Sequence, residues 1–192
     1  TGCDGPPVIF TITVYPTPTV NTIADQVYCN GDTSPLTVIS GPVSGTTFTW
    51  LNNNTNIGLG ASGTGDIPSF ITTNNTNDSI IATITINPMA NGCPGTSLDF
   101  NITVNPTPTV NSIADQTYCH GDSTSITTVG SPVSGATITW TNSNSAIGLP
   151  ISGTGNIPPF IAINTGTAPI SATITLNVSA NCCSGISSDF VI

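Results

Sequence analysis

Short stretches of alternating apolar and polar residues recur along this chain and predict β-strands. The segments "FTITV" from Phe10, "ATITI" from Ala82, "FNITV" from Phe100 and "ATITL" from Ala172 alternate with a period of two, as a strand with one buried face does. Runs rich in glycine, proline and asparagine separate them and are typical of turns. No stretch shows the 3.6-residue period of an amphipathic helix. The pattern therefore predicts an all-β protein.

The second half of the chain repeats the first at a fixed offset. The phrase "YPTPTVNTIADQVYCNGD" begins at Tyr15 and "NPTPTVNSIADQTYCHGD" begins at Asn105, an offset of 105 − 15 = 90 residues that also relates Trp50 to Trp140. Roughly seven strands in about 90 residues is the size of an immunoglobulin-like (Ig-like) β-sandwich. We therefore expect tandem Ig-like sandwich repeats.

The offset also sets the expected domain boundaries. Residues 1–14 match residues 91–104, so residues 1–15 are expected to be the C-terminal hairpin of a preceding repeat. A first repeat then covers 16–105 and a second covers 106–192, with its last strand slightly truncated. The chain thus has the phase of an excerpt from a longer array. Two prolines in the "NPTPTV" phrase predict a stiff linker between the repeats.

Composition narrows the function more than any motif does. The chain has no Lys or Arg and a formal net charge of −9, and charged residues make up 5% of it. Nucleic-acid binding needs cationic side chains to neutralise phosphates, and attraction to an anionic membrane surface needs them too. We therefore expect no nucleic-acid partner and no membrane insertion. A surface of Thr, Ser and Asn in place of charges is common in extracellular proteins.

Six cysteines follow the repeat and predict disulfides. Within each repeat, two cysteines lie beside turn signals, which predicts one bridge per repeat near one pole of each sandwich. The predicted pairs are Cys29–Cys93 and Cys119–Cys183. Metal-binding spacings such as C-x2-C do not occur, and persistent disulfides imply an oxidising compartment.

Two further cysteines fall outside these pairs. Cys3 is the counterpart of Cys93 and is expected to pair with a cysteine of a preceding repeat. Cys182 stands where the first repeat has Gly92, and is either an unpaired thiol or an alternative partner for Cys119.

Catalytic chemistry finds few candidates. His120 is the only imidazole, and its counterpart in the first repeat is Asn30, so a turn role is favoured over a catalytic one. Trp50 and Trp140 lie on predicted strands at the same register; exposed, they would suggest a glycan-stacking platform, but their repetition favours burial in the core. We expect no enzymatic activity.

Four carboxylates shared by both copies offer the only metal hypothesis. Calcium binds loop carboxylates and carbonyls, and Asp25 and Asp115 follow the linker while Asp32 and Asp122 lie in "NGD" or "HGD" turns. No dense Asp cluster occurs, and an Asp in such a turn commonly caps it. We expect no cofactor, with structural calcium as the open alternative to turn capping.

The phrases "NPTPTVNSIADQTYCHGD", "GSPVSGATITWTNSNSAIGL" and "SGTGNIPPF" resemble the PKD-like, Ig-like repeats of very large cell-surface proteins of Bacteroidota. The chain departs from classical PKD domains, which carry W-x-F-G-D-G, because Trp50 is followed by "LNNN" and Trp140 by "TNSN". The resemblance implies an exported, non-catalytic sandwich repeat of adhesin or gliding-motility proteins. It also implies O-glycosylation at Asp-Ser/Thr motifs, matched here at Ser79 and Ser123.

These observations together predict a structural segment of an extracellular adhesin, stalk or filament. Its partners are expected to be neighbouring repeats, identical chains in a filament, and glycans. The alternative is a carbohydrate-binding module or a spacer of a secreted multidomain protein.

Overall fold

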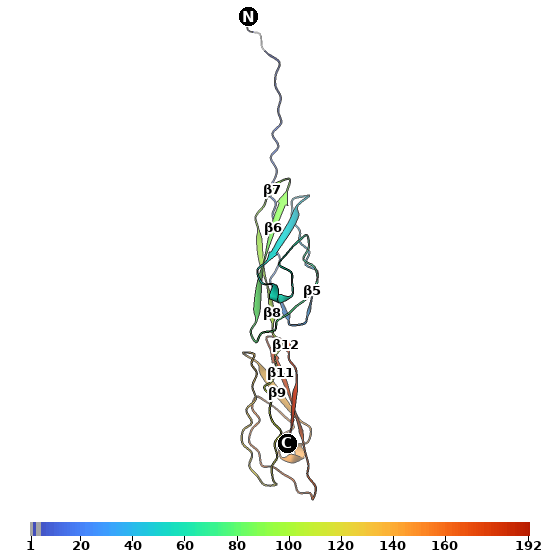
Figure 1. The fold of residues 1–192 in the computed structure, drawn as a ribbon, viewed down its shortest axis with the longest axis vertical. Helices are drawn as coiled ribbons and strands as arrows, with labels where there is room; N and C mark the ends of the chain where they lie inside the picture. The colour runs from blue at the N-terminus through green and yellow to red at the C-terminus, as the bar shows by residue number, and fades with distance from the viewer. Residues whose placement is uncertain (1, 3–4) are drawn as a thin grey trace.

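Two β-sheet units follow one another along the long axis of the molecule in the computed structural model, which describes residue 2 and residues 5–192. The first unit contains strands β1–β8 and the second contains β9–β13; they are called the first and second repeat below. Figure 1 shows them end to end, with the N-terminal segment extending from the far end of the first repeat and the C-terminus in the second.

The first repeat is built from eight strands and one 3-10 turn, η1 (Thr55–Ile57). Its larger sheet has the order β1-β8-β6-β3-β4, with β7 paired to β6, and a small second layer is formed by β2 and β5. The strands are β1 (Gln26–Cys29), β2 (Thr33–Ser34), β3 (Thr47–Asn52), β4 (Ser62–Thr64), β5 (Phe70–Ile71), β6 (Ile80–Ala90), β7 (Cys93–Pro94) and β8 (Leu98–Asn105). All its pairings are antiparallel except β1 with β8.

The second repeat has the same plan with fewer paired residues. Its sheet has the order β10-β9-β11-β12, with β13 paired to β11, and isolated bridges at Ser123 and Thr127 stand where the second layer would be. The elements are β9 (Thr137–Asn142), η2 (Ser145–Ile147), β10 (Ser152–Thr154), β11 (Thr173–Ala180), β12 (Cys183–Ser184) and β13 (Ser188–Val191). The expected all-β, tandem Ig-like sandwich architecture is confirmed.

Each repeat buries its own core around one tryptophan. Trp50 and Trp140 are 4% and 2% exposed, which confirms the predicted core position. Gly63 and Gly153 on the adjacent strands β4 and β10 make this possible, because a Cβ at either glycine would overlap the indole ring. Alternation along β6 and β8 then fills the rest of the core with isoleucine, valine and phenylalanine.

The N-terminal segment does not form the expected hairpin. Residues 5–15 run extended away from the first repeat and pair with no strand among the described residues (Figure 1). The alternating apolar pattern of a buried strand is present here, but the sheet that would hold it is not part of this chain. Its apolar side chains are consequently exposed, Val8 at 90% and Val14 at 87%.

Candidate functional site

The joint between the two repeats is the part of the molecule with the densest set of specific contacts between units, and we take it as the candidate functional site. The chain leaves β8 at Asn105 and enters the second repeat through two prolines, Pro106 and Pro108, both buried. Pro16, the counterpart of Pro106 at the start of the first repeat, is exposed. Burial of Pro106 is therefore due to the neighbouring repeat rather than to the linker sequence.

The linker is held along the second repeat by backbone hydrogen bonding. The N–H of Ile186 donates to the carbonyl of Pro108 at 3.1 Å, and Thr109 and Ile186 form a parallel bridge. Gly185 must lack a side chain, since a Cβ there would overlap the carbonyl oxygen of Pro108. The two prolines thus join a fixed path instead of a free tether.

Asparagine side chains connect the two repeats. The amide of Asn30 donates from Nδ2 to the hydroxyl of Thr107 at 3.1 Å, and the amide of Asn105 donates to the carbonyl of Asn181 at 3.2 Å. The backbone N–H of Asn30 also donates to the carbonyl of Asn105 at 2.8 Å. Sequence reasoning missed these residues, although one signal was available: Asn105 differs from its counterpart Tyr15, which has no preceding repeat to contact.

A disulfide between Cys29 and Cys183 crosses the joint, with their Cα atoms 5.7 Å apart. Cys29 ends β1 at the bottom of the first repeat, and Cys183 begins β12 at the top of the second. The bridge spans 154 positions of sequence and is a second covalent connection beside the linker. The two sandwiches are thereby attached to each other at two points.

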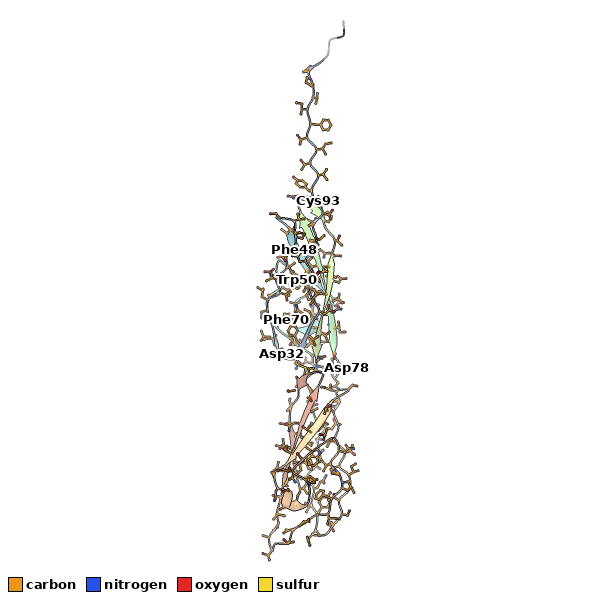
Figure 2. All side chains as sticks on the ribbon, turned by 180° about the vertical axis from the view of Figure 1, so that it is seen from behind. Asp32, Phe48, Trp50, Phe70, Asp78 and Cys93 are labelled. Carbon is orange, nitrogen blue, oxygen red and sulfur yellow. A yellow bond between two sulfur atoms is a disulfide. The ribbon has the colours of Figure 1, made fainter. Side chains whose placement is uncertain are left out.

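The predicted intra-repeat pairings Cys29–Cys93 and Cys119–Cys183 are wrong. Cys29 lies at the end of the sheet where Ile80 begins β6, whereas Cys93 pairs with Ala90 at the other end of that strand. Ten residue steps along a strand span about 33 Å, far beyond the Cα separation that a disulfide allows. Figure 2 shows Cys93 at the upper end of the first repeat and Asp32, three positions after Cys29, at the lower end.

Three described cysteines have no disulfide partner: Cys93, Cys119 and Cys182. Cys119 and Cys182 are exposed and Cys93 is partly exposed. The prediction for Cys3 lies outside the described residues. Cys182 adopts the left-handed conformation with φ of +66°, as does its counterpart Gly92 with φ of +76°.

The four calcium candidates each accept a backbone hydrogen bond. Asp25 and Asp115 accept from the N–H groups of the last strand of their repeat, at 2.7 and 2.8 Å. Asp32 and Asp122 accept from the N–H groups of Cys29 and Cys119, three residues earlier, and so cap turns. Across residue 2 and residues 5–192, no three His, Cys, Asp or Glu side chains gather as a metal would require.

His120 takes over a structural hydrogen bond from the first repeat. Its Nδ1 accepts from the N–H of Asn164 at 3.1 Å, and in the first repeat the Oδ1 of Asn30 accepts from the N–H of Asn74 at 2.8 Å. An imidazole and an amide therefore do the same work at equivalent places. This favours the turn role over a catalytic one.

The two glycosylation candidates are both exposed on the surface. Ser79 donates its hydroxyl to Oδ1 of Asn105 at 2.7 Å, and Ser123 forms an isolated bridge with Ile161. Attachment of a sugar at Ser79 would replace that bond beside the joint. No helix among the described residues has the length and apolar character needed to cross a membrane.

Comparison with known proteins places the first repeat in a family. Residues 22–108 match the PKD-like domain family, and no curated protein sequence matches the chain significantly. Domains of the PKD-like and Ig-like kind are typically non-catalytic modules of extracellular proteins. The second repeat shares the phrases of the first at the 90-residue offset (140 − 50 = 90).

Several solved structures of tandem extracellular domains are similar to the chain. A human mucin-like protocadherin fragment, EC1-2, has 14% identity and a TM-score of 0.42 over 91% of this chain and 96% of that one. Cadherin domains 1–4 of protocadherin gamma B7 have 16% identity and a TM-score of 0.44, and this chain spans 48% of them. The insect immune protein hemolin has 13% identity and a TM-score of 0.44, with 46% of its chain covered.

Proposed function

We propose that this chain is a non-catalytic, load-bearing segment of an extracellular stalk, adhesin or filament, built from sandwich repeats that span 16–105 and 106–192. The observation that carries the proposal is the Cys29–Cys183 disulfide across the joint. The absence of cationic side chains and the resemblance to Bacteroidota surface repeats support it. Persistent disulfides form in oxidising compartments, which favours an extracellular location.

The disulfide has a mechanical consequence that a bridge within one repeat would not have. Tension applied at the two ends of the chain passes from Cys29 directly to Cys183, because the bridge is the shorter covalent path. Residues 30–182, a total of 182 − 30 + 1 = 153, lie inside the closed loop and carry no end-to-end extension. Unfolding under force therefore cannot lengthen this part of the chain while the bridge is intact.

Single-molecule force spectroscopy tests the proposal on the 192-residue chain held at its ends. Under non-reducing conditions, unfolding should release only the residues outside the loop. With a reducing agent, the loop should add about 500 Å of contour length, at roughly 3.3–3.6 Å per residue. Equal lengths in both conditions would contradict the load-bearing role of the bridge.

The alternative of a carbohydrate-binding module receives no support from the tryptophans. Trp50 and Trp140 are buried in the two cores and cannot stack on a sugar. The proposed glycosylation of Ser79 and Ser123, and partners that are neighbouring repeats or identical chains, belong to the stalk proposal. Intact mass under non-reducing conditions reports the disulfide and any attached sugar together.

A further inference from the structure

A groove of about 800 Å³ opens at the lower end of the second repeat, the end that faces away from the joint. Its apolar lining comes from the loop that follows the linker, from the chain around η2 and from the end of the last strand. The lining includes Tyr118, Ile147, Phe160, Ala162, Ile163 and Ile192.

In the first repeat, the end of strand β8 fills the corresponding place. Val104 is 0% exposed there and is aligned with Tyr28 in the parallel pairing of β1 with β8. The carbonyl of Val104 accepts from Nδ2 of Asn74 at 2.7 Å. The N–H of Asn30 donates to the carbonyl of Asn105 at 2.8 Å. The groove of the second repeat is therefore the seat of a strand end.

The second repeat shows what this seat lacks. Strand β13 stops at Val191, and residues 116–119, the counterpart of β1, pair with no strand. Strand β11 begins three residues later than its counterpart β6, because its partner does not reach that far (173 − 90 = 83, against Ile80). Nδ2 of Asn164 donates only to the carbonyl of Ala168.

A segment of the same chain matches this seat in sequence and is itself unpaired. Phe10, Ile12 and Val14 are the 90-residue counterparts of the three apolar residues of β8 that face the core (100 − 10 = 90). The three counterparts in β8 are at most 2% exposed, whereas Phe10 is 77%, Ile12 76% and Val14 87% exposed. The seat without a strand and the strand without a seat lie at opposite ends of the molecule (Figure 1).

We propose that Phe10–Tyr15 of a second copy of this chain inserts into the groove and extends the sheet of the second repeat, so that copies join head to tail. This rests on the stalk function proposed above and names its partner. Addition of an extended segment to an open sheet position is an established mode of recognition. The joint inside the chain is the template, since β8 enters the second repeat in the same way.

Insertion begins at the unoccupied positions. Thr13, Val14 and Tyr15 correspond to the end of β8, for which the second repeat offers open positions. Phe190 and Ile192 already occupy the seats of Phe10 and Ile12, so full insertion displaces the last residues of the receiving copy from the sheet. The displaced residues are of the same kind as those that replace them, and the added contacts of Val14 favour the exchange.

The free thiols supply an independent observation that fits the same arrangement. Cys119 and Cys93 are the counterparts of Cys29 and Cys183, the two ends of the bridge across the joint (119 − 29 = 90 and 183 − 93 = 90). Head-to-tail joining places Cys119 of one copy beside Cys93 of the next. Forming that bridge removes two protons and two electrons from the thiols. A disulfide oxidant such as oxidised glutathione accepts them and is reduced to two thiols.

Sedimentation velocity of the 192-residue chain tests the strand insertion, with the three thiols alkylated so that no new bridge can form. Head-to-tail oligomers should grow with concentration. Val14→Asp places a charge in the apolar seat and should weaken association about a hundredfold or more. Thr13→Asp is the matched control, because Thr103, its counterpart, is not buried and faces away from the core. Both variants alter an unpaired segment, so the repeats keep their fold.

A second measurement separates specific joining from general stickiness. The unmodified chain treated with oxidised glutathione should give a Cys93–Cys119 linkage between copies, mapped by mass spectrometry. Cys182 is equally exposed and should not be linked. A chain that stays monomeric, variants that associate equally, or linkage through Cys182 would each overturn the proposal. The stalk function would survive that result, because its force test uses single molecules.

Discussion

Removing the bridge across the joint should destabilise both repeats by the same amount. The perturbation is the double variant Cys29→Ala with Cys183→Ala. When the second repeat unfolds and the first stays folded, the bridge and the linker close a loop of 183 − 105 = 78 residues. When the first repeat unfolds and the second stays folded, the loop is 105 − 29 = 76 residues.

Chain entropy sets the magnitude. A loop of this length costs an unfolded segment about 4 to 5 kcal/mol at 25 °C in the loop-closure description, and measured disulfides often give less. We therefore expect each repeat to lose about 3 to 5 kcal/mol of unfolding free energy. The losses should match, because loop closure depends only weakly on length and the two loops are nearly equal.

Native-state hydrogen exchange measured by mass spectrometry reads the two repeats separately. Amides of β6 and β11 report the first and second repeat, and each should exchange about a hundredfold to a thousandfold faster in the variant. The control is Cys93→Ala with Cys119→Ala, which removes the equivalent cysteines that form no bridge in this chain. Unchanged exchange in the double variant, or a loss confined to one repeat, would refute the argument.

Three further substitutions test local features of the fold. Gly153→Ala should cost about 1–3 kcal/mol, measured by urea unfolding, because the added Cβ overlaps the indole of Trp140. Cys182→Gly should raise stability by up to about 1 kcal/mol in the same assay, since residue 182 has a positive φ that glycine adopts readily. Asn142→Leu should cost about 2–4 kcal/mol, because the buried amide donates to Leu149 and Pro150 carbonyls and accepts from the N–H of Asn144. A neutral result for Asn142→Leu would mean that water satisfies those groups.

Much of the fold could be predicted because alternation and repetition are local signals. The three apolar residues of "FNITV" at 100, 102 and 104 are buried as a period of two requires. The tryptophan register was readable for the same reason. Pairing partners were not, because the parallel pairing of β1 with β8 joins residues 76 positions apart (102 − 26 = 76).

The disulfide could not be predicted because turn signals do not say at which end of a sandwich a turn lies. Cys29 and Cys93 both stand beside glycine-containing turns, yet they lie at opposite ends of β6. A repeat with one cysteine at each end can bond only to its neighbours. Unequal exposure now reflects this: Cys183 is buried at the joint, while Cys93, its counterpart, is partly exposed.

The lengths of the bridge and of the repeat together determine how an array of these repeats would carry load. The bridge spans 154 positions and the repeat 90, so bridges formed at successive joints overlap by 154 − 90 = 64 positions. Every position between the first and last bridge then lies inside at least one closed loop. A break in the hydrogen bonding of one sandwich could not unravel the array under tension, because the neighbouring bridges would keep the covalent path short. Bridges within single repeats would leave each linker as the only connection, and the joint would bend freely there.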